Sequence, residues 1–108
     1  MQFNYIIDQI GNKSWFKGNV IHREDGPAYE GVNGLKVWYF DGLLHRDNGP
    51  AYESGKHKAW YHHNERHRLD GPAIEFENGD CEWWFDGKRI LVETQEEFEK
   101  YLKLKAFW

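Results

Sequence analysis

Three copies of one motif carry most of the side chains that could do chemistry. The motif is His-Arg-x-Asp-Gly-Pro-Ala, with Asn for Asp in the second copy, and it spans residues 22–28, 45–51 and 67–73. An imidazole, a guanidinium and a carboxylate so close together could serve acid–base catalysis. A residue that recurs in every unit, however, is usually one that every unit needs. We therefore expect the arginines to bind nearby carboxylates and the histidines to bind corner carbonyls.

A structural role is assigned in the same way to every recurring side chain. Asn48 replaces the aspartate of the other two copies, which argues against an obligatory charge at that position. No catalytic residue is predicted. The residues assigned to the repeat structure are Trp15, Trp38, Trp60, Trp83, His22, Arg23, His45, Arg46, His67 and Arg68.

Four of the six histidines lie between residues 57 and 67. His63 and His67 have the i, i+4 spacing of a helical metal site, but this stretch has the pattern of a hairpin, where that spacing does not place both rings on one ion. His62 and His63 are expected on opposite faces of a strand. No acidic residue completes a ligand set, so the sequence predicts no metal and no cofactor.

The same stretch, Lys56–Arg68, is the most basic part of the chain. Its histidines and cations depart from the repeat pattern, so they need not serve the fold and could bind an anionic ligand or a partner. Trp84 is also distinct, because the other units have Phe or Tyr there. The candidate ligand- or partner-binding residues are Lys58, His62, His63, Arg66 and Trp84.

The motif belongs to a longer repeat with steps of 23 and 22 residues. A Trp-aromatic pair precedes each histidine by seven residues, a turn dipeptide such as Asp41-Gly42 follows the pair, and Gly-Pro makes a corner in which Gly allows a positive φ. A second hairpin turn, Asn33-Gly34 in the first unit, follows the alanine. The predicted repeats are residues 15–37, 38–59 and 60–82, with a partial unit at 83–92.

The two ends of the chain differ from the repeats. Residues 1–14 suggest an edge strand, and Thr94-Gln95-Glu96-Glu97 fits a capping box at the start of a helix over 94–105. The helix is expected to cover the last repeat. Leu104, Phe107 and Trp108 make an apolar tail.

Composition excludes several classes of protein. The chain has 108 residues, enough for one domain, and 18% of them are aromatic, so rings are expected to form most of the core and disorder is excluded. A net charge of −4 argues against non-specific nucleic-acid binding, and no apolar run is long enough to span a membrane. One cysteine, Cys81, provides no disulfide framework, and its surroundings indicate packing rather than nucleophilic chemistry. We expect a cytoplasmic protein.

The pattern Trp38-Tyr39-Phe40-Asp41-Gly42-Leu43-Leu44-His45 resembles the MORN repeat, in particular its MORN-2-like variants. The His-Arg-x-Asp-Gly-Pro-Ala corner departs from that family and is more similar to largely uncharacterised repeat proteins of tailed phages and large DNA viruses. The ending Trp83–Lys88 and the acidic Glu96-Glu97-Phe98 match that type. The resemblance implies a β-hairpin array that mediates interactions, in the host cytoplasm if a phage encodes it.

The predicted fold is mainly β, a single twisted antiparallel sheet of repeated β-hairpins with one short C-terminal α-helix. The predicted function is that of a non-enzymatic binding protein, by resemblance a phage-type accessory protein that inhibits a host defence protein. The alternative is a sponge that sequesters a nucleotide-type signal between aromatic and arginine side chains. Nineteen rings on one thin sheet also predict a homodimer.

Overall fold

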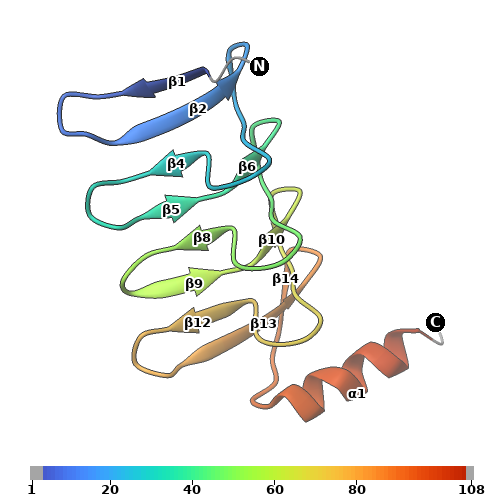
Figure 1. The fold of residues 1–108 in the computed structure, drawn as a ribbon. Coiled ribbons are helices and arrows are strands. Elements are labelled where there is room, and N and C mark those ends of the chain that lie inside the picture. The colour runs from blue at the N-terminus through green and yellow to red at the C-terminus, as the bar shows by residue number, and fades with distance from the viewer. Residues whose placement is uncertain (1–3, 107–108) are drawn as a thin grey trace.

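The described part of the chain, residues 4–106 of a computed structural model, is mainly β with one C-terminal helix (Figure 1). The predicted fold class is therefore confirmed. The strands are β1 (Asn4–Ile7), β2 (Lys13–Lys17), β3 (Val20–Ile21), β4 (Tyr29–Glu30), β5 (Lys36–Val37), β6 (Tyr39–Phe40), β7 (Leu43–Leu44), β8 (Tyr52–Glu53), β9 (His57–Ala59), β10 (Tyr61–His62), β11 (Glu65–Arg66), β12 (Ile74–Phe76), β13 (Cys81–Phe85) and β14 (Lys88–Ile90), and the helix is α1 (Gln95–Lys105).

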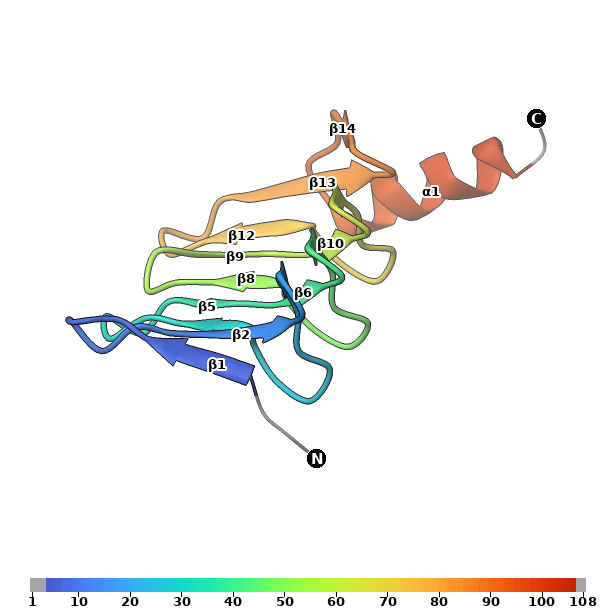
Figure 2. The same cartoon turned by 90° about the horizontal axis from the view of Figure 1, so that it is seen from above.

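Long hairpins stack side by side to make the main sheet. Its order is β1-β2-β4-β5-β8-β9-β12-β13-β14, every neighbouring pair is antiparallel, and β3 pairs with β2. Figure 1 shows the hairpins one above another, and Figure 2 shows the same stack from above. Each repeat adds one hairpin, which is why the 22–23-residue period appears as a regular step along the array.

Short hairpins form a second row along one end of the main sheet. They are β2–β3, β6–β7, β10–β11 and β13–β14, and backbone hydrogen bonds link each to the next. The Arg23 amide donates to the Tyr39 carbonyl at 3.1 Å, and the Gly42 amide donates to the Ile21 carbonyl at 2.9 Å. The array therefore has two rows of hairpins within the predicted class.

The turns of three short hairpins have the φ values of a type I′ turn, which suits the right-handed twist of the strands. The φ angles are 49° and 81° at Asp41-Gly42, 47° and 72° at His63-Asn64, and 47° and 79° at Asp86-Gly87. These are the turn dipeptides that the repeat pattern predicts. Asn tolerates the left-handed region better than most residues, so His63-Asn64 can replace Asp-Gly.

Small side chains fill the tightest part of the corners. Ala28, Ala51 and Ala73 have 0% exposure, and their carbonyls accept the amides of Trp15, Trp38 and Trp60, at 2.8 Å for Trp15 to Ala28. The expectation that rings form most of the core is therefore only partly right. Trp15, Trp83 and Phe98 are buried, whereas the other repeat tryptophans are half-buried.

The predicted C-terminal helix is present as α1, and it packs against the last short hairpin. The Thr94 side chain accepts a hydrogen bond from the Glu97 amide at 3.2 Å, which confirms the cap, and Phe98 is fully buried. The Trp83 indole donates to the Gln95 side chain at 2.7 Å and so fastens the helix to the last hairpin. In the predicted tail, Leu104 is exposed, and Phe107 and Trp108 lie outside the described residues.

Among residues 4–106, no helix is both long enough and apolar enough to cross a membrane.

Candidate functional site

Each repeat arginine lies flat over the repeat tryptophan of its own unit. Distances from the guanidinium carbon to the ring centroid are 3.9 Å for Arg23 over Trp15, 4.1 Å for Arg46 over Trp38 and 3.9 Å for Arg68 over Trp60. Each arginine also donates to the corner proline carbonyl four residues later, at 3.1 Å in all three units. A planar guanidinium can stack and donate at once, which an ammonium cannot do. The stack therefore explains why each unit needs Trp and Arg.

The corner glycine makes room for that guanidinium. A Cβ at Gly26, Gly49 or Gly71 would lie 2.6–2.7 Å from the arginine Cζ of its unit. None of the three has a positive φ. The expectation that a positive φ selects this glycine is therefore wrong, because the constraint is the space above the tryptophan.

Two carboxylates hold the arginine at the first and third corners, as the sequence predicts. Arg23 Nε is 3.0 Å from Asp25, and Nη1 is 3.1 Å from Glu30. The third unit repeats this arrangement with both distances at 2.9 Å. The third-unit ion pairs are Arg68–Asp70 and Arg68–Glu75.

The central arginine, Arg46, makes no ion pair with any of residues 4–106. Asn48 puts a neutral amide where the other corners have a carboxylate. Glu53, the counterpart of Glu30, is 3.8 Å from Lys58 instead. Among the described residues, the guanidinium of Arg46 is held by the stack on Trp38 and by the hydrogen bond to the Pro50 carbonyl.

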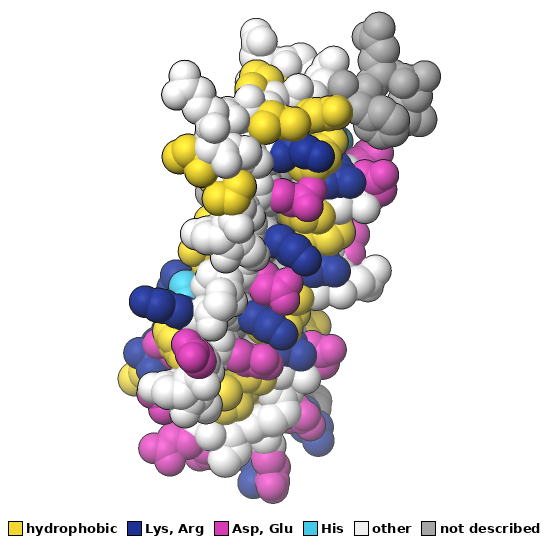
Figure 3. Space-filling view, turned by 60° about the vertical axis from the view of Figure 1, so that its left-hand side comes forward, with side chains coloured by type: hydrophobic (Ala, Val, Ile, Leu, Met, Phe, Trp, Pro, Cys, Tyr) yellow, Lys and Arg dark blue, Asp and Glu magenta, His cyan; other side chains and the backbone are white. Residues whose placement is uncertain are grey.

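Glu53 is part of a line of alternating charges across the main sheet. Strand register places opposite charges next to one another along one face, and Figure 3 shows Lys or Arg side chains alternating with Asp or Glu along the array. Lys58 faces both Glu53 and Glu75 in this register. The residues of the line are Lys13, Glu30, Lys36, Glu53, Lys58 and Glu75.

The repeat histidines join one short hairpin to the next. Nδ1 of His22, His45 and His67 accepts a backbone amide from the following turn, at 2.8, 3.1 and 3.0 Å. The prediction that these histidines bind the backbone is correct. The partners differ from the prediction, because in the described part of the chain the rings accept hydrogen bonds from backbone N–H groups and do not donate to carbonyls. Because Nδ1 accepts, the ring proton lies on Nε2. In the central unit His45 Nε2 donates it to Asp47 at 2.9 Å.

A row of rings follows these histidines along the short hairpins. His22 and Phe40 have centroids 4.7 Å apart, His45 and His62 are 4.8 Å apart, and His67 and Phe85 are 5.1 Å apart. In this row His62 takes the place of Phe40 and Phe85. His63 likewise takes the turn position of Asp41 and Asp86 and stacks on His45 at 4.3 Å.

These differences gather at one place, which we call the central corner: His45, Arg46, Asp47, Asn48, His62 and His63. Hollows of about 730 and 660 Å³ lie on its two sides. Four of its residues line both hollows, namely Arg46, Asp47, Asn48 and His62. Each hollow also contains carboxylates, so neither is a purely basic pocket.

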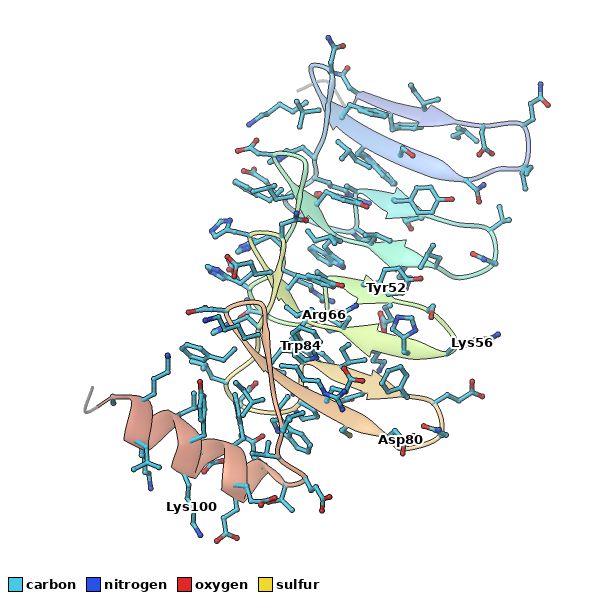
Figure 4. The ribbon with its side chains drawn as sticks, turned by 180° about the vertical axis from the view of Figure 1, so that it is seen from behind. Tyr52, Lys56, Arg66, Asp80, Trp84 and Lys100 are labelled. Atoms are coloured by element: carbon cyan, nitrogen blue, oxygen red, sulfur yellow. The ribbon has the colours of Figure 1, made fainter. Side chains whose placement is uncertain are left out.

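The five predicted binding residues fall in three separate places. His62 and His63 belong to the central corner, whereas Lys58 lies on the main sheet. Arg66 lies 4.9 Å from the Trp84 ring and donates to the Tyr61 hydroxyl at 3.1 Å, as Figure 4 shows for the labelled Arg66 and Trp84. Since Arg66 pairs with Tyr61 across the hairpin and His62 pairs with Glu65, the two pairs face opposite sides.

The expectation that His62 and His63 face opposite sides is wrong. Their ring centroids are 4.4 Å apart, because His63 is a turn residue with φ 47° and strand alternation ends before it. Sequence reasoning also assigned His45 and Arg46 to structure alone. The signal that could have found them is Asn48, which removes one carboxylate from this corner.

Cys81 is exposed on β13. Partial burial, with the nearby carboxylates of Glu75 and Asp80, raises the pKa of its thiol. The reactive thiolate is therefore disfavoured, which agrees with the expectation that this cysteine is not a nucleophile.

No protein-family model matches the chain, and neither a curated protein nor a solved structure shows significant similarity to it.

Proposed function

We propose that this chain is a non-enzymatic binding protein that contacts a partner protein through the central corner. The observation that carries the proposal is Arg46, a stacked arginine without the two carboxylates that hold Arg23 and Arg68. A carboxylate of the partner would pair with Arg46 beside Asn48, in the way that Asp25 and Asp70 pair with the outer arginines. The two hollows give a partner side chain room on either side.

The alternative of a nucleotide sponge has less support. A sponge needs an open aromatic face for the base and cations that converge on phosphate. The faces of Trp38 and Trp60 are covered by Arg46 and Arg68.

The repeat histidines offer little to an enzyme. Nδ1 of each already accepts a backbone amide, so it is not free to take a substrate proton. The absence of enzymatic activity stays a prediction. The identity of the partner as a host defence protein, and the phage origin, rest on the repeat resemblance alone and also stay predictions.

Self-association is a second proposal, favoured by the N-terminal edge. Strand β1 pairs on one side with β2, and Tyr5, Ile6 and Ile7 are 48%, 62% and 54% exposed. An apolar edge without charges is prone to pair with another strand, so a second copy of this chain could add its own β1 there. Light scattering should find a dimer that Ile6→Lys converts to a monomer; a wild-type monomer at about 100 µM would overturn this proposal, since specific dimers usually form well below that concentration.

The experiment for the partner proposal is capture from bacterial lysate with tag-matched baits. Wild type, Arg46→Glu and Lys36→Glu would be compared by quantitative mass spectrometry. Lys36 is an exposed cation on the main sheet, so Lys36→Glu makes the same charge change away from the site. We expect one protein captured by wild type and Lys36→Glu and lost with Arg46→Glu. Capture that is equal with all three baits would contradict the proposed surface.

A further inference from the structure

We infer that His45, His62 and His63 form a binding site for a divalent transition-metal cation of the Zn²⁺ class. Each of the three offers a ring nitrogen, and these atoms lie within 4.8 Å of one another. Imidazole nitrogen suits Zn²⁺ and its neighbours in the first transition row, and three histidines are a sufficient protein ligand set when water fills the fourth position. The inference does not depend on the proposed protein partner.

The tautomer of His45 already suits metal binding. Asp47 accepts the Nε2 proton at 2.9 Å, so Nδ1 carries the free electron pair that a metal requires. A carboxylate that holds the opposite nitrogen of a ligating histidine is the usual outer partner in metal sites. Nδ1 now accepts the His63 amide at 3.1 Å, and a cation would replace that single hydrogen bond. The freed amide belongs to an exposed turn residue, where water can take its place.

The other two ligands can adjust to a shared ion. His62 and His63 are both exposed, and no hydrogen bond from either imidazole ring to any of residues 4–106 is found. Metal–nitrogen bonds of about 2.0–2.1 Å in a tetrahedron require nitrogens roughly 3.4 Å apart. Rotation about the side-chain bonds of two surface residues is enough to shorten the present separations.

The neighbouring turns of the short-hairpin row lack this ligand set, although their backbone is the same. Phe40-Asp41 and Phe85-Asp86 stand where this turn has His62-His63. Only the repeat histidines His22 and His67 lie beside those turns. The cluster is therefore a local addition to the repeat and not one of its structural requirements.

A bound cation would also change the charge of the central corner. Three histidine rings are in mutual contact there, with centroids 4.3–4.8 Å apart, and Arg46 is the next residue after His45. A divalent ion would add positive charge beside an arginine that has no ion pair within the described chain. The result would be a stronger site for a carboxylate from outside.

The test is calorimetric titration of the tag-free chain with Zn²⁺, supported by the visible absorption of Co²⁺ as a substitute. His62→Phe installs the residue of the neighbouring turns, and His63→Asn removes the imidazole with a residue that tolerates the left-handed turn, so both should leave the fold intact. His57→Ala is the matched control, because His57 stacks on Tyr52 on the main sheet, away from the cluster. Circular dichroism and thermal unfolding would show that each variant folds.

We expect one Zn²⁺ per chain and the intense Co²⁺ absorption of a four-coordinate ion. His62→Phe and His63→Asn should each weaken binding by at least tenfold, Asp47→Asn should weaken it about 10–100-fold through the lost outer partner, and His57→Ala should leave it unchanged. The inference is overturned if wild type binds no Zn²⁺ at millimolar concentration. It is equally overturned if folded His62→Phe and His63→Asn bind as tightly as wild type.

Discussion

The outer corners and the central corner share a scaffold and differ in the charges around it. At all three, an arginine covers a tryptophan and donates to a proline carbonyl. Two carboxylates complete the outer corners, whereas Asn48 and the Glu53–Lys58 pair leave Arg46 without either. The stack and the carbonyl bond are thus what the fold requires. The ion pairs of Arg23 and Arg68 with carboxylates are not required, since the central corner folds without them.

The turns of the short hairpins differ in the same way. Asp41 and Asp86 in the outer turns donate their amides to His22 and His67, and His63 does the same for His45. The backbone contact is constant while the side chain changes from a carboxylate to an imidazole. Function is therefore expected where the units diverge at positions that the fold does not need.

The largest effect is expected on removing the shared stack. Trp38→Ala and Trp60→Ala should each lower the free energy of unfolding by about 3 kcal/mol, the low end for a large aromatic because both rings are half-buried. Urea unfolding would measure both. Equal losses in the free energy of unfolding would confirm that the two corners have a common scaffold. An unchanged free energy of unfolding in Trp38→Ala would show that they do not.

The arginines should separate the two kinds of corner. Arg68→Ala loses the stack, the carbonyl bond and two ion pairs, whereas Arg46→Ala loses only the first two. We expect losses of about 2 kcal/mol for Arg68→Ala and about 1 kcal/mol for Arg46→Ala, since partly exposed ion pairs add only a few tenths of a kcal/mol to 1 kcal/mol each. Thermal unfolding of both variants would test the order. An equal or larger loss at Arg46 would mean that it has carboxylate partners after all.

A smaller effect is expected from exchanging Asp and Asn between corners. The hydrogen bond from Arg68 lowers the pKa of Asp70, so the ionised form of Asp70 stabilises the folded state. This contribution is present above the unfolded pKa of aspartate and is lost as the pH falls through the lower folded pKa. Asp70→Asn should cost about 0.5 kcal/mol at neutral pH and nothing in strong acid, because the side chain is exposed.

Asn48→Asp is the reverse exchange and should gain a similar amount at neutral pH by giving Arg46 its missing partner. Unfolding measured from pH 7 down to pH 2 would test both directions. A gain that persists in acid would indicate a cause other than the ion pair.

The smallest effect is expected at the ring row. His62→Phe puts the ring found at Phe40 and Phe85 into the turn of residues 61–66 and should change stability by less than about 0.5 kcal/mol, since the side chain is exposed. Thermal unfolding compared with wild type would measure it. A large loss would show that the imidazole is part of the fold, which would weaken the argument that it is free for binding.

Local features of the fold were predictable from the sequence because their causes are local. Asp41-Gly42 and its counterparts indicate tight turns, Thr94 indicates a helix start, and the repeat period indicates stacked hairpins. The second row of hairpins was not predictable, because it depends on how each short hairpin packs against the next one along the array. That packing brings His45 beside His63, 18 residues later.

The candidate site was only half predictable for the same reason. The departure of His62 and His63 from the repeat is visible in the sequence, and so is Asn48. The sequence does not show that Arg46 also lacks its second carboxylate, because Glu53 is present at the expected position. Only the side-chain geometry shows that Glu53 pairs with Lys58 and not with Arg46. The sequence shows which charged side chains are available, but the packing of the strands determines which of them form ion pairs.

The most direct test is the affinity of the captured partner for Asn48→Asp, with Asp70→Asn as the matched control. Both variants differ from wild type by one charge at equivalent corner positions. Asn48→Asp should weaken binding about 10–100-fold by neutralising Arg46 within the chain, as expected for the loss of a charge-assisted contact. Asp70→Asn should bind like wild type. Unchanged binding by Asn48→Asp, or an equal loss in both variants, would contradict the account.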